Sequence, residues 1–90
     1  MRWTILKKVI SLNTLELNKT GKVQDILCDK HSKRRFLDLG IIKGTLITPL
    51  FRSPFSDPTA YEINNTVIAI REDDAKMITV TYWKFLYFMV

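Results

Sequence analysis

The stretch from Lys33 to Thr45, KRRFLDLGIIKGT, most limits what this chain can fold into, because a helix must start and stop around these thirteen residues. Ser32 can cap the helix N-terminus, and Phe36 and Leu39 lie three apart on one helical face. Gly40 can adopt the left-handed conformation that ends a helix, because glycine has no Cβ. The stretch therefore predicts a helix of about two turns.

The same stretch carries charge in an unexpected place. Lys33, Arg34 and Arg35 put three positive charges on the expected first turn of the helix. The helix dipole is already positive there, so each such charge costs about 0.3 kcal/mol or more. Two interpretations follow: a basic corner that meets an anionic partner, or a solvated surface whose long side chains cover apolar neighbours.

Alternating apolar residues and turn signals predict five short strands around this helix. They cover residues 22–28, 45–51, 60–64, 66–70 and 77–81. Pro49 places its strand at an edge or on a bulge, since proline cannot donate to a ladder. Asn64 and Asn65 predict a tight hairpin, because asparagine tolerates positive φ. Residues 71–76 are expected to form a polar turn or a single helical turn. We therefore predict a mainly β fold, a small five-stranded antiparallel barrel with one short helix after the first strand.

Composition excludes several classes of protein. Ninety residues, 47% of them apolar and 26% charged, indicate one folded domain. The single cysteine, Cys28, excludes an intramolecular disulfide and favours a reducing cytoplasm. No apolar run approaches the roughly 20 residues of a membrane-spanning helix. The net charge of +5 lies in the first half of the chain, but without the concentrated stripe or reading element expected of a nucleic-acid-binding protein.

Few residues suggest catalytic or metal chemistry. Cys28 and His31 lie three apart and could contribute a thiolate and an imidazole to Fe²⁺ or Zn²⁺. Two ligands do not make a site, and the alternative is an inert thiol beside a solvated imidazole. The acidic cluster Glu72, Asp73 and Asp74 is expected to solvate a turn. The sequence has no nucleophile elbow, phosphate-binding loop or dinucleotide motif, so we do not predict an enzyme.

The final segment, residues 82–90, reads YWKFLYFMV, and eight of its nine residues are apolar or aromatic. Left exposed, such a segment would require a partner. We expect it to continue the last strand back onto the barrel or onto the stretch from Trp3 to Ile10. A homo-oligomer contact through this tail and a membrane-surface contact are the alternatives.

Residues 11–81 resemble the FeoA family, small cytoplasmic accessory proteins of bacterial ferrous iron uptake. The strings that carry the resemblance are RRFLDLGIIKGT, SDPTAYEI and VIAIREDDAKMITV. They match an RLxxLGLxxGT-like segment, a loop ending in glycine-aspartate-proline, and a closing I-x-L-R-x-x-(D/E)-A before a valine strand. Ser56 departs from the glycine usual before Asp57, and Asn65 stands near a usual hairpin glycine. Residues 1–10 and 82–90 have no counterpart in a minimal member.

The resemblance implies an SH3-like barrel, with residues 1–90 as a single domain. It also implies a non-enzymatic module that docks on the cytosolic G-domain region of the FeoB ferrous iron permease, and so reaches the inner face of the membrane through that partner. We expect Leu37 and Leu39 to hold the helix to the barrel, and a contact groove between the helix and loop 52–59. The candidate partner-binding residues are Arg34, Arg35, Leu37, Leu39, Gly40 and Asp57.

A metal-sensing regulatory domain is the alternative. Similar SH3-like barrels are fused to iron-dependent repressors, and such a domain would bind a divalent transition metal. Cys28 and His31 would then be the weak candidates for its ligands.

Overall fold

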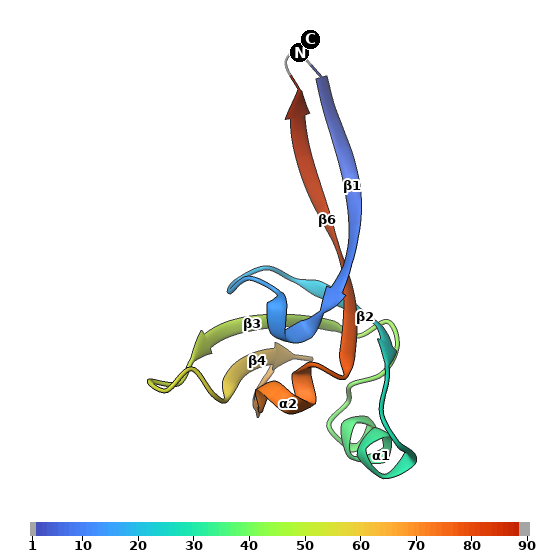
Figure 1. The fold of residues 1–90 in the computed structure, drawn as a ribbon, viewed down its shortest axis with the longest axis vertical. Coiled ribbons are helices and arrows are strands. Elements are labelled where there is room, and N and C mark those ends of the chain that lie inside the picture. Colours follow the sequence, from blue (N-terminus) through green and yellow to red (C-terminus); the bar gives the residue numbers. More distant parts are fainter. Residues whose placement is uncertain (1, 89–90) are drawn as a thin grey trace.

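The structure, a computed structural model, describes residues 2–88 and is built on one twisted antiparallel sheet (Figure 1). Its strands are β1 (Arg2–Ser11), β2 (Gly21–Ile26), β3 (Leu46–Arg52), β4 (Thr59–Ile63), β5 (Thr66–Ile70) and β6 (Ile78–Phe88). Two helices, α1 (Lys30–Asp38) and α2 (Glu72–Ala75), and a 3₁₀ turn (Leu12–Thr14) complete the described chain.

The sheet has the strand order β1-β6-β2-β3-β4-β5. It agrees with the predicted mainly β, SH3-like class, but it has six strands instead of five and stays open across residues 2–88. The additional strand is β1. Lys7 and Lys8 interrupt the apolar alternation of this segment, which is why the sequence pattern did not predict a strand there.

The predicted continuation of the last strand is confirmed. β6 runs through residues 82–88 and pairs with β1 from Arg2↔Phe88 to Ser11↔Thr79. The last two residues of the predicted segment, 89 and 90, lie outside the described residues. The tail is therefore paired within the chain, and Figure 1 shows the two strands projecting well beyond the rest of the sheet.

The core lies inside the curved part of the sheet. Strand residues such as Ile47, Ile78 and Val80 have no exposed surface. The same holds for Leu12 in the segment before β2, and Leu15 is only 2% exposed. The core cluster in the described part of the chain is apolar, apart from the phenol of a tyrosine: Leu12, Leu15, Val23, Ile26, Phe36, Ile41, Ile47, Tyr61, Ile63, Ile70, Ala75, Ile78 and Val80. Their removal from water is the main stabilising term in a domain of this size.

The prediction for the first strand of the barrel is partly wrong. Strict alternation over the predicted strand 22–28 would place Val23, Asp25 and Leu27 on the same face, but β2 ends at Ile26. A bulge between Val23 and Asp25 shifts the pairing with β6 by one residue. As a result Ile26 enters the core, while Leu27 is 66% exposed.

The helix starts earlier than predicted. Its N-cap is Asp29, whose Oδ1 accepts a hydrogen bond from the Ser32 backbone N–H at 2.8 Å, so Ser32 is not the cap. That hydrogen bond lowers the pKa of the Asp29 carboxyl and keeps it ionised against the positive helix end. The predicted charge conflict is only partly wrong. Arg35 lies in the last turn of α1, where the dipole favours a cation, but Lys30 and Lys33 are the first and fourth residues of the helix, and its first turn contains no acidic residue.

The predicted helix end is confirmed. Gly40 has φ +85°, its N–H donates to the Leu37 carbonyl at 2.9 Å, and the Ile41 N–H donates to the Phe36 carbonyl at 2.9 Å. These two bonds form a Schellman motif, which satisfies carbonyls that the helix leaves unpaired. Ile41 is buried beside them, as expected for the apolar residue after such a cap.

Two predicted turn features are also confirmed. Asn64 and Asn65 have φ values of +50° and +64° and join β4 to β5 directly, as a primed hairpin turn requires. The pairing of β3 with β4 shifts between Pro49 and Phe51, so the proline lies at an irregularity of the ladder. Ser56 adopts φ +68°, a conformation that glycine reaches with less strain.

We predict that Gly40→Ala lowers the free energy of unfolding by about 1 kcal/mol, because an L-residue is strained at positive φ. A Cβ there would also lie 3.2 Å from Asn64 Nδ2. Urea denaturation measures the change. The control is Lys33→Ala, an exposed change on the same helix that should stay within about 0.5 kcal/mol. Equal stability of the Gly40→Ala and wild-type proteins would contradict the assignment of the helix cap.

Candidate functional site

Helix α1 is held to the sheet mainly by Phe36, which is 1% exposed. The expectation that Leu37 and Leu39 provide this anchor is wrong, since they are 58% and 39% exposed. Both lie next to the buried face rather than on it, because one residue corresponds to about 100° around a helix. The two leucines are therefore available at the surface.

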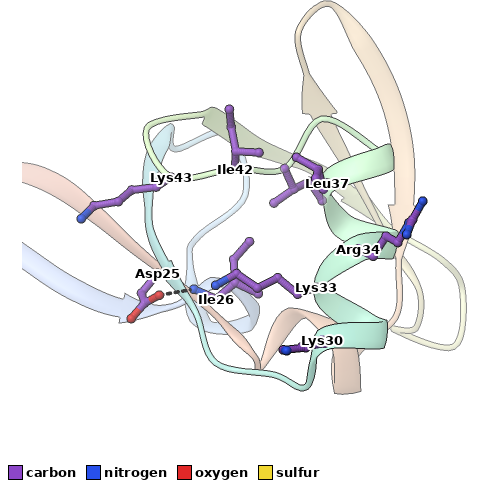
Figure 2. Close-up of a pocket in the computed structure, with 9 residues that line it drawn as sticks. Asp25, Ile26, Lys30, Lys33, Arg34, Leu37, Ile42 and Lys43 are labelled. Atoms are coloured by element: carbon purple, nitrogen blue, oxygen red, sulfur yellow. Dashed lines mark hydrogen bonds between the residues drawn. The ribbon is translucent and has the colours of Figure 1, made fainter.

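A groove of about 420 Å³ lies between α1, the end of β2 and the segment that follows the helix (Figure 2). Apolar residues and charged residues both line it. The apolar ones are Ile26, Leu37, Ile41 and Ile42, and the charged ones are Asp25, Lys30, Lys33, Arg34 and Lys43. This volume is within the range of about 300–1,000 Å³ that is typical of binding pockets.

The charge of this groove is strongly positive, since four of its five charged residues are cations. The one acid, Asp25, uses Oδ1 to accept the Ile26 backbone N–H at 2.8 Å, the dashed line in Figure 2. Figure 2 also shows Lys33 extending from α1 toward Ile26, whereas Arg34 leaves the outer side of the helix. The groove thus combines apolar walls with a cationic rim, and we call it the basic groove.

Backbone hydrogen bonds hold the far wall of the basic groove in place. The Gly44 N–H donates to the Val23 carbonyl, and the Val23 N–H donates to the Thr45 carbonyl, each at 2.8 Å. The Thr45 hydroxyl donates to the Gly40 carbonyl at 3.2 Å and lies 3.2 Å from the Ile42 N–H. The GIIKGT part of the sequence therefore fixes the groove wall to β2.

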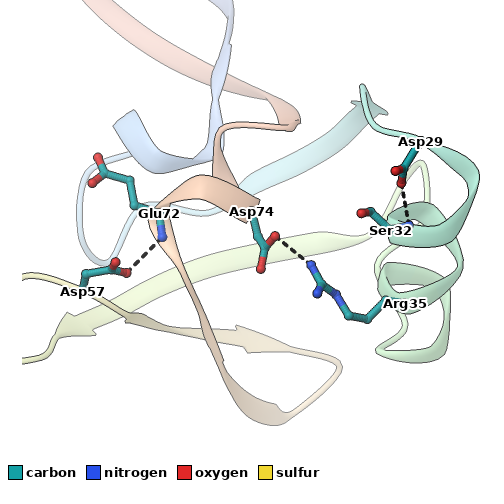
Figure 3. Close-up of polar contacts among 6 residues, drawn as sticks. All are labelled: Asp29, Ser32, Arg35, Asp57, Glu72 and Asp74. Carbon is teal, nitrogen blue, oxygen red and sulfur yellow. Dashed lines mark hydrogen bonds and ion pairs between the residues drawn. The ribbon is translucent and has the colours of Figure 1, made fainter.

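The opposite side of α1 faces α2. The Arg35 guanidinium donates a hydrogen bond to Asp74 Oδ1 at 2.7 Å (Figure 3). It also lies 5.5 Å from the centre of the Phe36 ring. Leu39 lies on this side, where it lines a hollow together with Arg35, Asp74 and residues of β5. Arg35 thus joins the two helices, so its charge is already partly compensated.

Asp57 lies at the other end of α2. Its Oδ1 accepts a hydrogen bond from the Glu72 backbone N–H at 3.0 Å (Figure 3). Its backbone carbonyl accepts a hydrogen bond from the Ser53 hydroxyl at 2.7 Å. Asp57 therefore caps α2, whose own N-cap residue Arg71 provides no side-chain hydrogen bond. The expectation of a groove between α1 and loop 52–59 is wrong. Helix α2 is hydrogen-bonded to Arg35 of α1 and to Asp57 of the loop, and it lies between them.

The predicted site residues are thus divided among three places. Arg34 and Leu37 line the basic groove, Arg35 and Leu39 face α2, and Asp57 belongs to the far end of α2. Gly40 follows the end of α1, the helix whose two sides contribute to the first two places.

Of the nine residues that line the basic groove, only Arg34 and Leu37 are among the predicted binding residues, and Lys33 belongs to the predicted basic corner. The sequence analysis missed Asp25, Ile26, Lys30, Ile41, Ile42 and Lys43 as groove residues. Recognising Asp29 as the N-cap would have brought Lys30 into the helix. By contrast, the sequence around Lys43 indicates only a turn, so it gives no signal that Lys43 lines a groove.

The candidate metal ligands do not assemble into a larger cluster. Burial and then the nearby Asp29 carboxylate raise the pKa of the Cys28 thiol, which favours the protonated form that binds metals poorly. His31 is exposed on the first turn of α1. Among residues 2–88, no three His, Cys, Asp or Glu side chains are close enough to hold a metal ion. None of the helices in that range is long and apolar enough to cross a membrane.

Comparison with known proteins agrees with this architecture. A family model described as the FeoA domain matches residues 10–82. A FeoA-like protein from Clostridium acetobutylicum is 33% identical with a TM-score of 0.74, over 81% of this chain and 85% of that chain. Comparison with curated proteins gives no match.

More distant structures share the fold alone. FeoA of Stenotrophomonas maltophilia in complex with zinc, described as a prokaryotic SH3 domain protein, is 24% identical with a TM-score of 0.69, over 79% of this chain and 88% of that chain. IdeR of T. acidophilum is 22% identical with a TM-score of 0.71, over 81% of this chain and 33% of that chain.

We predict that the Arg35–Asp74 ion pair contributes a coupling energy of about 0.5–1 kcal/mol to stability, since it is well aligned but partly exposed. A double-mutant cycle with Arg35→Ala and Asp74→Ala, measured by urea denaturation, gives this energy. It should shrink in about 1 M salt. A coupling energy of zero at low salt would show that the pair does not hold α1 against α2.

Proposed function

The chain belongs to the FeoA domain family, which is associated with ferrous iron transport, and from this we propose that it is a non-enzymatic accessory module that docks on the cytosolic part of the FeoB permease. The observation that carries the proposal is the basic groove beside α1. The module would act at the inner face of the membrane, where that part of the permease lies.

The chemistry of the groove indicates what it would bind. Apolar walls formed by Ile26, Leu37 and Ile42 suit one or two apolar side chains of a partner. The cations on the rim, among them Lys30 and Lys33, suit carboxylates on the same segment. An acidic amphipathic segment of the permease's cytosolic part fits both requirements.

The two kinds of contact would contribute differently. Apolar anchors in a desolvated pocket usually carry most of the affinity, while charges at the rim mainly accelerate the encounter and set its salt dependence. Leu37 is 58% exposed without a partner, so covering it would add favourable burial on binding. Arg35 would contribute indirectly, through its ion pair with Asp74 that positions α1.

We predict that the double variant Lys33→Glu, Arg34→Glu slows association with the soluble cytosolic domain of the permease by about tenfold or more, because it reverses the charge of the rim. Biolayer interferometry at two salt concentrations measures the rate. Leu37→Ala should instead mainly speed dissociation, since it removes an apolar anchor.

A matched control separates the groove from net charge. Lys19→Glu with Lys76→Glu changes the charge by the same amount at exposed positions outside the groove. It should alter association by no more than about twofold. The proposal fails if wild type does not bind the domain, or if the control loses as much binding as the groove variant.

Metal sensing is the second candidate, and the observation that favours it is the fold shared with a manganese-dependent transcriptional repressor, which is 22% identical with a TM-score of 0.73. The Cys28 and His31 pair gives it little support, because no third ligand lies beside them in the described chain. Under this alternative the chain would bind a divalent metal ion directly, and docking on a protein segment would not be its primary role.

We expect one equivalent of Zn²⁺ to leave the ring signals of His31 unchanged in NMR spectra. His31 is the only histidine of the chain, so its signals are unambiguous. Cys28→Ser is the control for any weak thiolate effect. A stoichiometric shift that Cys28→Ser abolishes would favour the sensing role over docking.

A further inference from the structure

The outer part of β1 and β6 forms a two-stranded ribbon that the function proposed above does not use. β2 pairs with β6 only from Ile26↔Ile78 to Lys22↔Thr81. Beyond Thr81, residues 82–88 pair only with residues 2–8 of β1, and we call these two segments the β1–β6 ribbon. Figure 1 shows it projecting from one end of the molecule, with α1 at the opposite end.

The composition of the ribbon is unusual for a strand pair surrounded by water. Six of the seven residues from 82 to 88 are aromatic or aliphatic. The side chain of Trp83 is 64% exposed and that of Leu6 41%, so the rest of the chain does not cover them. An isolated two-stranded ribbon is marginally stable, and exposed apolar surface of this kind indicates a binding surface.

The pairing register divides the ribbon residues between two faces. Cross-strand partners share a face and successive residues alternate. One face holds five aromatic or aliphatic residues and a single cation: Trp3, Ile5, Lys7, Trp83, Phe85 and Tyr87. The other face holds the remaining three cations among mixed neighbours: Arg2, Thr4, Leu6, Lys8, Tyr82, Lys84, Leu86 and Phe88.

The charge of the ribbon is of one sign. Its four cations are accompanied by no Asp or Glu in residues 2–8 or 82–88. A second copy that docked ribbon to ribbon would bring four more cations to the contact and no acid. An anionic bilayer supplies the complementary charge as well as an apolar layer, and tryptophan, tyrosine and lysine are the residues that suit the boundary between them.

We propose that the β1–β6 ribbon is a membrane-surface anchor that lies in the interface of an anionic lipid bilayer. The face with Trp3 and Trp83 enters the boundary between headgroups and acyl chains. The cations of the opposite face stay within a Debye length of the anionic headgroups, because a sheet is only one strand thick. This arrangement leaves α1 and the basic groove at the far end of a molecule whose longest extent is 50 Å.

The chain carries its own reporter for this inference, because its two tryptophans, Trp3 and Trp83, are both in the ribbon. The full chain is mixed with phosphatidylcholine vesicles containing about one third phosphatidylglycerol, at low salt. The expected result is a blue shift of tryptophan emission and its quenching by lipids brominated on the acyl chains. Binding to pure phosphatidylcholine should be weaker by about tenfold or more, and added salt should weaken binding to the anionic vesicles.

Variants locate the contact on the ribbon. Trp83→Glu and the double variant Lys7→Glu, Lys8→Glu should each lower the vesicle-bound fraction in co-sedimentation by about fivefold or more. Lys7 and Lys8 are exposed, so the double variant tests the inference even if Trp83→Glu does not fold. Phe55→Glu is the control: Phe55 is 91% exposed in the loop before β4, outside the ribbon, and the change should leave the bound fraction unaltered.

Three outcomes would overturn the inference. The first is unchanged tryptophan emission with anionic vesicles at low salt. The second is an equal loss of binding in Phe55→Glu, which would remove the ribbon as the contact. The third is a blue shift without vesicles that rises with protein concentration and accompanies a dimer in sedimentation equilibrium, which would make a second copy the occupant. None of these outcomes depends on whether the basic groove binds the permease.

Discussion

The pairing of β6 with two different partners is the interaction on which the rest of the structure depends. Its first residues pair with β2, and Ile78 and Val80 have no exposed surface in the core. Its later residues leave that core and pair with β1 alone. β6 therefore connects the part of the chain that the family model matches to the projecting ribbon. The packing of its first residues in the core sets the direction in which the ribbon projects. A marginal two-stranded element is held in place by a well-packed base.

The candidate site depends on how α1 is fixed at both ends. Asp29 caps its start, Gly40 closes its end, and Phe36 is buried beneath it, a burial that contributes about 1.5–3 kcal/mol. With these three points set, the cations of the helix separate by side. Lys33 lines the basic groove, whereas Arg35 pairs with Asp74. Lys33 is thus available on the groove side, whereas Arg35 is already paired on the side that faces α2.

Several features could be predicted from the sequence because they depend on neighbouring residues. Gly40 and the Asn64-Asn65 pair adopt the positive φ values expected of a helix end and a hairpin turn. Two of the wrong expectations come from a shift of one or a few residues along the chain. A bulge after Val23 moved Ile26 to the core, and an earlier cap moved Arg35 to the last turn. Such shifts arise from pairing across the sheet or from competition between adjacent capping residues, which a periodic pattern does not resolve.

The sequence by itself determined the class of fold, the turns, the end of α1 and the likeness to one family, since these follow from backbone preferences and local spacing. Only the tertiary structure decided which residues form a surface together. The basic groove takes Ile26 from β2, Lys33 from α1 and Lys43 from the following segment, and the ribbon joins the two ends of the described chain. These residues meet because strand pairing and core packing bring together segments that are distant in the sequence. Local backbone preferences do not determine which distant segments become neighbours.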